Sequence, residues 1–179
     1  MLAHLLTGLR LALALPVALA FAYSNTFAAG TLFGLILVAI ASDLADGRAA
    51  RHFKTASSAG MLFDHTTDFI FVTTALLGIA WSGRIEFLLP VLIAVAFSQY
   101  VLDSYLLFRQ KSLRMSVLGR WNGVFYFTPL LLFASADLSA NALSSYLNLT
   151  GEAVVWALCV STAASIADRG LAPLRSSQS

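Results

Sequence analysis

Long runs without a charged side chain alternate with short polar segments along this chain. The longest run, 11–42, is too long for one membrane span and is broken by the turn-forming segment 23–26, so two helices fit into it. Shorter uncharged runs follow, each close to the length of one span, at 69–83, 87–102, 121–136 and 153–167. The pattern predicts six helices, at 5–23, 27–46, 61–83, 86–108, 117–136 and 150–169.

Composition adds that these helices belong in a bilayer. Of the 179 residues, 59% are hydrophobic and only 11% charged, and the mean hydropathy is +0.80. Six spans of about 20 residues use roughly 120 positions and leave no room for a soluble domain. We expect an all-α integral membrane protein with one transmembrane domain over 1–179. The single cysteine excludes a disulfide-stapled module, and the net charge of +2 argues against a nucleic-acid partner.

Basic residues gather on one side of the predicted bundle. With six spans, only Arg84 among the 11 Lys and Arg falls on the opposite side. The positive-inside rule therefore puts both termini in the cytoplasm. It also predicts a protein of the cell (inner, cytoplasmic) membrane whose basic side faces the cytoplasm. The segment 10–22 also has features of a cleavable signal peptide, but Arg10 lies well inside the apolar stretch, which favours a retained helix.

Four aspartates gather at the predicted cytoplasmic ends of the second and third helices. They are Asp43, Asp46, Asp64 and Asp68. Spacings of three and four residues put each pair on one helix face, so antiparallel helices bring the carboxylates together. Oxygen-rich clusters suit Mg²⁺ or Mn²⁺. The alternative is that these residues only end helices and pair with the nearby basic side chains of Arg48, Arg51 and Lys54.

These residues form a motif with a known counterpart. The pattern Asp43-x2-Asp46-Gly47-x2-Ala50-Arg51-x8-Gly60-x3-Asp64-x3-Asp68 resembles the signature of the CDP-alcohol phosphotransferase (CDP-alcohol phosphatidyltransferase) family at every fixed position. The resemblance extends to six spans and to an early Leu6-Thr7-x2-Arg10 segment. It implies phospholipid biosynthesis, in which the phosphatidyl group of CDP-diacylglycerol passes to the hydroxyl of a small alcohol and CMP is released.

The resemblance also assigns roles to the motif residues. The four aspartates would hold Mg²⁺ or Mn²⁺, as a pair of ions, and Asp68 would also be the catalytic base. The nucleotide and diphosphate would be bound by residues at the junction of the second and third helices: Asp46, Gly47, Ala50, Arg51 and Gly60. Physically, this is metal-assisted in-line displacement.

The acceptor alcohol is less strongly indicated. Arg114 and Arg120 could bind the phosphate of a phosphorylated acceptor. The segment Ser116-x2-Gly119-Arg120 also resembles a basic stretch of phosphatidylglycerophosphate synthases, which use glycerol 3-phosphate as the acceptor. Against this, Phe69 follows the last motif aspartate where those synthases commonly place Lys. A non-phosphorylated or inositol-type acceptor, or another CDP-alcohol donor, therefore stays open. Gln99 and Asp103 have two interpretations: they contact the acceptor alcohol, or they form hydrogen bonds between helices.

Two further hypotheses concern function class and packing. Carboxylates inside membrane helices also mark ion pathways, so a cation transporter is the rival to an enzyme. The four aspartates lie at one end rather than along a path, which favours the enzyme. The pattern Gly30-x3-Gly34 predicts a close contact between helices. It favours a contact inside the bundle over a contact in a homodimer.

Overall fold

All regular structure in the described part of the chain is helical. A computed structural model describes residues 2–23, 26–52, 58–102 and 117–176. Within them lie seven helical segments: α1 (Leu2–Ala22), α2 (Ala29–His52), α3 (Ser58–Trp81), α4 (Leu88–Leu102), α5 (Val117–Phe125), α6 (Phe127–Leu138) and α7 (Asn141–Ser176). The prediction of an all-α protein is therefore confirmed for these residues.

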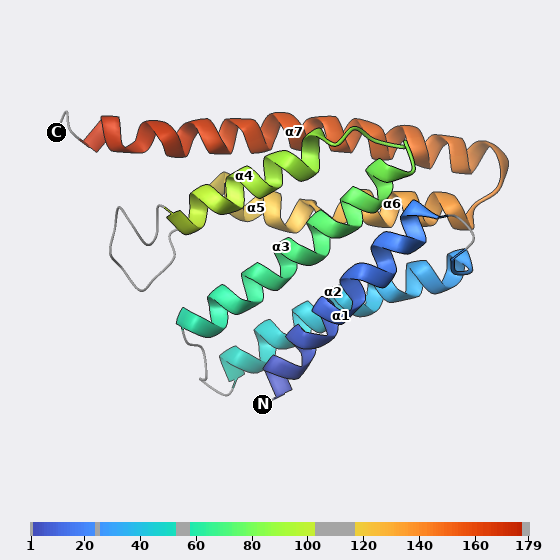
Figure 1. Ribbon diagram of the computed structural model, residues 1–179, viewed down its shortest axis with the longest axis horizontal. Helices are drawn as coiled ribbons and strands as arrows, with labels where there is room; N and C mark the ends of the chain where they lie inside the picture. The colour runs from blue at the N-terminus through green and yellow to red at the C-terminus, as the bar shows by residue number, and fades with distance from the viewer. Residues whose placement is uncertain (1, 24–25, 53–57, 103–116, 177–179) are drawn as a thin grey trace.

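The helices enclose one apolar core. α1 packs on α2 and α3, α6 joins α2 to α7, and α4 closes the bundle between α3 and α7 (Figure 1). The largest fully buried hydrophobic side chains of the core are Phe21, Phe71, Phe133, Ile36, Leu76, Ile79, Leu89, Leu130 and Val17. α1 contributes Val17 and Phe21, so the first helix is an integral part of the bundle. α1 begins and α7 ends toward the end of the bundle at which α2 ends and α3 begins (Figure 1).

Helices α1 and α3 approach each other closely at a glycine that the sequence pattern did not single out. A Cβ atom on Gly78 of α3 would collide with the backbone of Ala18 in α1. The prediction of close packing at Gly30 and Gly34 is wrong at Gly34. Among the described residues, a Cβ there would meet nothing within 4 Å, and one at Gly30 would make only an ordinary contact with Leu138 at 3.9 Å. Spacing alone identifies a face of small residues, whereas the neighbouring helix decides which face is covered.

Helix boundaries differ from the predictions at several positions, including the end of α7, which lies at Ser176 instead of 169. α2 continues to His52, so the first part of the expected basic loop is helical. α7 begins at Asn141 instead of 150, because no glycine or proline interrupts 141–150. The predicted helix 117–136 is divided at Tyr126 into α5 and α6. Pro129 lies in the first turn of α6 and has no N–H to donate to the carbonyl four residues earlier, which accounts for the break.

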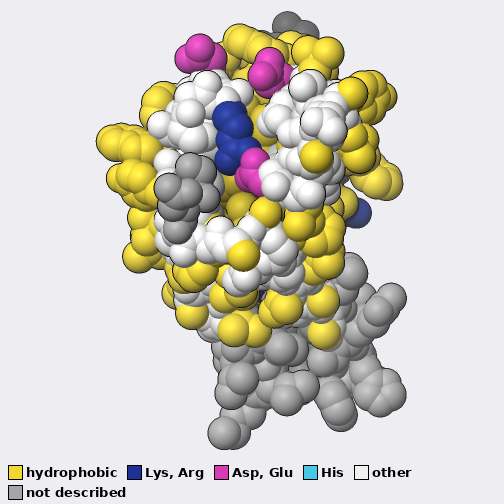
Figure 2. Space-filling model, turned by 90° about the vertical axis from the view of Figure 1, so that its right-hand side faces the viewer, with side chains coloured by type: hydrophobic (Ala, Val, Ile, Leu, Met, Phe, Trp, Pro, Cys, Tyr) yellow, Lys and Arg dark blue, Asp and Glu magenta, His cyan; other side chains and the backbone are white. Residues whose placement is uncertain are grey.

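Arg84 contacts several helices at the end of the bundle that lies opposite the start of α3. Arg84 donates from Nη1 to Oδ1 of Asp137 at 2.8 Å. Its guanidinium carbon also lies 5.5 Å from the ring centroids of Phe21 and Phe133. Figure 2 looks onto this end, where a basic group lies against an acidic group and hydrophobic side chains cover the flanks. These contacts link α1, the α3–α4 connection and α6.

The described helices differ in how clearly they suit a membrane. Segment Asn141–Gly170 of α7 is long and apolar enough to cross one, by length and composition. Shorter apolar segments within other helices are Thr7–Ala22, Ala29–Asp43 and Leu88–Leu102. α2 and α3 carry the acidic cluster at one end, which shortens their apolar parts. The number of six spans stays a prediction.

Candidate active site

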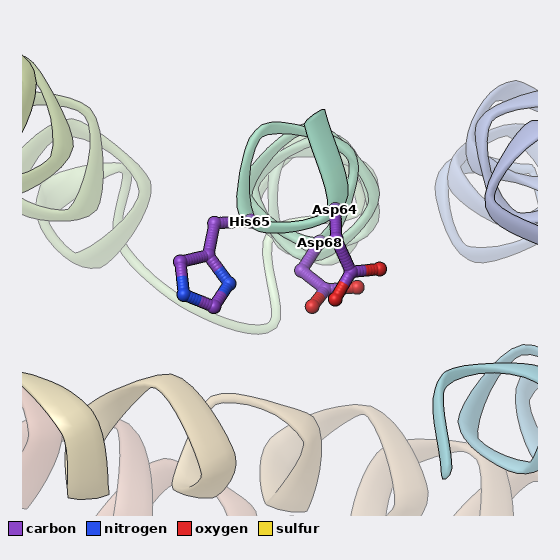
Figure 3. Close-up of side chains that lie close together, drawn as sticks. All are labelled: Asp64, His65 and Asp68. Carbon is purple, nitrogen blue, oxygen red and sulfur yellow. The ribbon is translucent and has the colours of Figure 1, made fainter. Parts of the chain in front are cut away.

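The end of α2 and the beginning of α3 bring three carboxylates together. Asp43 lies on α2, and Asp64 and Asp68 lie one turn apart on α3. Figure 3 shows that the side chains of Asp64 and Asp68 point to the same side of α3, with their carboxyl groups next to each other. All three carboxylates are partly exposed, at 34%, 28% and 25% of their side-chain surface for Asp43, Asp64 and Asp68. Three of the four aspartates of the predicted cluster thus lie together among the described side chains.

A fully buried arginine lies against this cluster. Arg10 on α1 has an exposed fraction of 0% and forms ion pairs with all three carboxylates. Its Nη1 donates to Oδ1 of Asp43 at 2.9 Å and also to Oδ1 of Asp68, while Nη2 donates to Oδ1 of Asp64 at 2.6 Å. The guanidinium thereby links α1, α2 and α3 through charged hydrogen bonds.

The donor atoms suit a divalent cation. Ligand atoms of Asp64, His65 and Asp68 lie within 4.8 Å of one another. The His65 ring lies beside the two carboxyl groups, on the flank of α3 that faces α4 (Figure 3), and its centroid is 6.4 Å from that of Tyr100. Carboxylate oxygens are the ligands that Mg²⁺ and Mn²⁺ prefer, and an imidazole nitrogen is also accepted by Mn²⁺. Asp43, Asp64 and Asp68, with His65 beside them, are the residues that could hold a metal.

A large cavity opens beside the carboxylates. It has a volume of about 700 Å³ and is lined by residues of α2, α3, α4, α5, α6 and α7. Asp43, Asp64 and Asp68 line it at one end, and most of the remaining wall is apolar. Ring stacking of Phe69 on Phe97, with centroids 4.2 Å apart and planes 5° from parallel, forms part of this wall directly after Asp68. The carboxylates thus face a space large enough for a substrate.

Polar groups also enter the cavity from α4, α5 and α7. Arg120, Arg169 and Gln99 all line it. The guanidinium of Arg169 lies 5.1 Å from the ring centroid of Tyr100. Gln99 donates from Nε2 to the carbonyl of Ile166 at 3.2 Å, and its buried Oε1 has no hydrogen-bond partner among the described residues. Gln99 therefore forms the interhelical hydrogen bond that one of its two interpretations predicted. Its role on the side of the acceptor alcohol stays a prediction.

The other predicted site residues are described to different extents. Asp46, Gly47, Ala50 and Arg51 fall in the last two turns of α2, and their side chains lie outside the description. Gly60 lies in the first turn of α3. Arg120 is exposed at the cavity, whereas Arg114 and Asp103 lie outside the described residues.

Three contributors to this site were not predicted from the sequence. Arg10 was counted only among the basic residues and the early motif, His65 was not considered as a ligand, and Arg169 was attributed to charge asymmetry. The signal for Arg10 was present, because a charged side chain in an apolar helix needs a partner of opposite charge.

Comparison with known proteins agrees with this geometry. The family model described as CDP-alcohol phosphatidyltransferase matches residues 1–164. The chain belongs to the CDP-alcohol phosphatidyltransferase family. No curated protein and no solved structure gives a significant match.

Family membership decides between the two function classes. CDP-alcohol phosphatidyltransferases are membrane enzymes that transfer a phosphatidyl group from a CDP-alcohol to an alcohol acceptor, and they use divalent metals. The chain is therefore a transferase, and the cation transporter hypothesis is wrong. In a CDP-alcohol phosphatidyltransferase, the acidic cluster at the mouth of a cavity has a direct chemical use, because the diphosphate of the donor is itself anionic and requires cations.

Proposed function

We propose that this enzyme transfers the phosphatidyl group of CDP-diacylglycerol to the hydroxyl of glycerol 3-phosphate and releases CMP, as a step of phospholipid biosynthesis. The observation that carries the proposal is the cluster of Asp43, Asp64 and Asp68 at the end of a cavity of about 700 Å³. Such a cavity can accommodate an acceptor beside the reacting phosphate.

The proposed roles of the motif residues follow from their chemistry. Asp43, Asp46, Asp64 and Asp68 would hold two Mg²⁺ or Mn²⁺ ions. When bound, these ions would neutralise the diphosphate and stabilise the departing CMP. Asp68 would take the proton from the attacking hydroxyl. Asp46, Gly47, Ala50, Arg51 and Gly60 would bind the nucleotide and diphosphate, with Arg51 offering its fork of donors to phosphate oxygens.

Cationic groups on the cavity wall support a phosphorylated acceptor. Arg120 on α5 and Arg169 on α7 both line the cavity. Arg114 of the sequence prediction would add a third cation. The stacked pair Phe69 and Phe97 instead presents an apolar surface next to the base, which leaves an uncharged alcohol or an inositol-type acceptor as the alternative.

The proposed cellular setting combines the spans with the charges. One transferase domain over 1–179 would cross the inner (cytoplasmic) membrane six times, with both termini and the aspartate cluster on the cytoplasmic side. The acyl chains of the donor could then remain in lipid while its nucleotide reaches the site from water. Further predicted spans are supported by the apolar segments Thr7–Ala22, Ala29–Asp43 and Leu88–Leu102.

CMP release tests the reaction directly. Purified protein in detergent would be given CDP-diacylglycerol, Mg²⁺ or Mn²⁺, and one acceptor at a time: glycerol 3-phosphate, inositol 1-phosphate, serine or glycerol. We expect CMP release with glycerol 3-phosphate that EDTA abolishes. Release with a different acceptor only would keep the chemistry and overturn the acceptor. No release with any acceptor from folded protein would overturn CDP-diacylglycerol as the donor.

A variant extends the same assay to the acceptor site. Arg169→Gln removes a cavity cation, so the KM for glycerol 3-phosphate should rise about tenfold or more, because hydrogen bonds to charged groups contribute about 1.5–3 kcal/mol. The KM for CDP-diacylglycerol should stay unchanged and serves as the internal control. An unchanged KM for glycerol 3-phosphate would remove Arg169 from the acceptor site.

A further inference from the structure

Arg10 occupies an unusual electrostatic position. It is fully buried, whereas the three carboxylates that it contacts are each a quarter to a third exposed and line the cavity. The guanidinium thus lies behind the carboxylates as seen from the cavity. A cation entering from the cavity reaches the carboxylates first, while Arg10 holds them from the protein side.

The charges of this cluster do not balance. When all are ionised, three carboxylates and one guanidinium leave a net charge of −2 among the described members. Carboxylates brought this close repel one another unless a cation lies between them. Arg10 supplies part of the compensating positive charge from within the chain, and a divalent ion would supply the rest.

The contacts reach across the tertiary structure. Arg10 is separated in sequence by 33, 54 and 58 residues from Asp43, Asp64 and Asp68. One side chain on α1 therefore gathers ligands from two other helices. All three contacts use Oδ1, and each carboxylate has a second oxygen with which to meet another cation.

We infer that Arg10 is a built-in counter-cation: it holds the carboxylates of Asp43, Asp64 and Asp68 together in the metal-free protein and competes with the divalent ion for their negative charge. This inference rests on the proposed metal site and adds to it a residue that sets the strength of metal binding. Arg10 is a positioning residue here, because it acts through the carboxylates. It keeps the ligands assembled before the metal arrives and weakens the binding of the metal once it is there.

Opposite effects on stability and metal affinity distinguish this role from simple packing. In Arg10→Gln, the metal-free protein should lose stability because the carboxylates repel without compensation. Bound Mn²⁺ should restore most of that loss. By linkage, the variant should bind Mn²⁺ at least about fivefold more tightly than the unmodified protein, since coupling between two sites is reciprocal.

The experiment measures thermal midpoints in EDTA and in Mn²⁺, and Mn²⁺ affinity by electron paramagnetic resonance, on the full chain in detergent. Arg84→Gln is the matched control because it removes another arginine–aspartate pair, the 2.8 Å contact with Asp137 at the opposite end of the bundle. We expect Arg84→Gln to lower the midpoint equally with and without Mn²⁺ and to leave Mn²⁺ affinity unchanged.

A second variant covers the case in which Arg10→Gln does not fold. Arg10→Lys keeps a positive charge but loses the planar fork that reaches several carboxylates. Its Mn²⁺ affinity should exceed that of the unmodified protein. Equal destabilisation of Arg10→Gln with and without Mn²⁺, or weaker Mn²⁺ binding by either variant, would overturn the inference alone. Absence of Mn²⁺ binding by the unmodified protein would overturn the proposed metal site and, with it, this inference.

Discussion

At the scale of single residues, the chemistry depends on which carboxylate accepts a proton. Asp68 lines the cavity beside the aromatic wall and is the proposed base. Asp68→Asn keeps the shape of the side chain but removes its basicity, so turnover should fall about 10²- to 10⁴-fold. CDP-diacylglycerol should still bind, since the other carboxylates remain. CMP release and equilibrium binding of the donor measure the two effects separately.

The control for this variant is an aspartate outside the cavity. Asp137→Asn removes the carboxylate that pairs with Arg84 at the opposite end of the bundle, and it should retain full turnover. If Asp68→Asn turned over at the rate of the unmodified protein, another group would have to be the base. If it lost donor binding together with turnover, Asp68 would act through the metal rather than as a base.

Residue spacing predicts a cluster better than it predicts the partners of that cluster. The i, i+4 relation of Asp64 and Asp68 is a property of one helix, so the sequence alone places them on one face. Arg10 contacts them from α1, although it is separated in sequence by 54 residues from Asp64 and by 58 residues from Asp68. That contact depends on how α1 packs against α3, and the side-chain pattern of α1 shows only that one charge needs a partner.

At the scale of helices, the close approach of α1 to α3 requires a glycine at one position. A methyl group on Gly78 would collide with the backbone of Ala18, and the backbone cannot move away as a flexible side chain would. Gly78→Ala should therefore destabilise the protein by about 1–3 kcal/mol, the usual cost of overpacking. For a chain of this length, each kcal/mol corresponds to roughly 2–4 °C in the thermal midpoint, which calorimetry in detergent can measure.

Gly34→Ala is the matched control within the same bundle. Its added methyl group meets nothing within 4 Å, so only helix propensity changes, and alanine is favoured by up to about 1 kcal/mol. The thermal midpoint should stay the same or rise slightly. A loss at Gly34→Ala as large as that at Gly78→Ala would mean that the α2 face of Gly30 and Gly34 is covered in solution by another molecule, as the homodimer hypothesis requires.

Helix boundaries were predicted less well than helix identities, for physical reasons. Uncharged length shows where an apolar helix can lie, but helices continue into polar segments when nothing stops them. α2 continues through charged residues to His52, and α7 begins well before its apolar part. The break at Tyr126 has a local cause, since Pro129 in the first turn of α6 has no N–H to donate to the carbonyl four residues earlier.

At the scale of the whole molecule, the two ends of the bundle differ in charge. One end carries the aspartate cluster with Arg10, and the other carries the compact Arg84–Asp137 pair among hydrophobic side chains (Figure 2). The charge asymmetry of the sequence predicts that the first end faces the cytoplasm. The links α1–α2, α3–α4 and α6–α7 would then face the outside, and the site would face the compartment that supplies the nucleotide substrate.

Accessibility of single cysteines tests this orientation. Cys159 is buried and would first be replaced by alanine to give a cysteine-free background. Ala140→Cys, in the exposed α6–α7 link, should react with a membrane-impermeant maleimide in intact cells, because this end is predicted to lie outside. Ser179→Cys, at the last residue of the sequence, should react only after the membrane is permeabilised. The reverse pattern would place the aspartate cluster outside the cell, where CDP-linked donors are not supplied, and the proposed orientation would then be wrong.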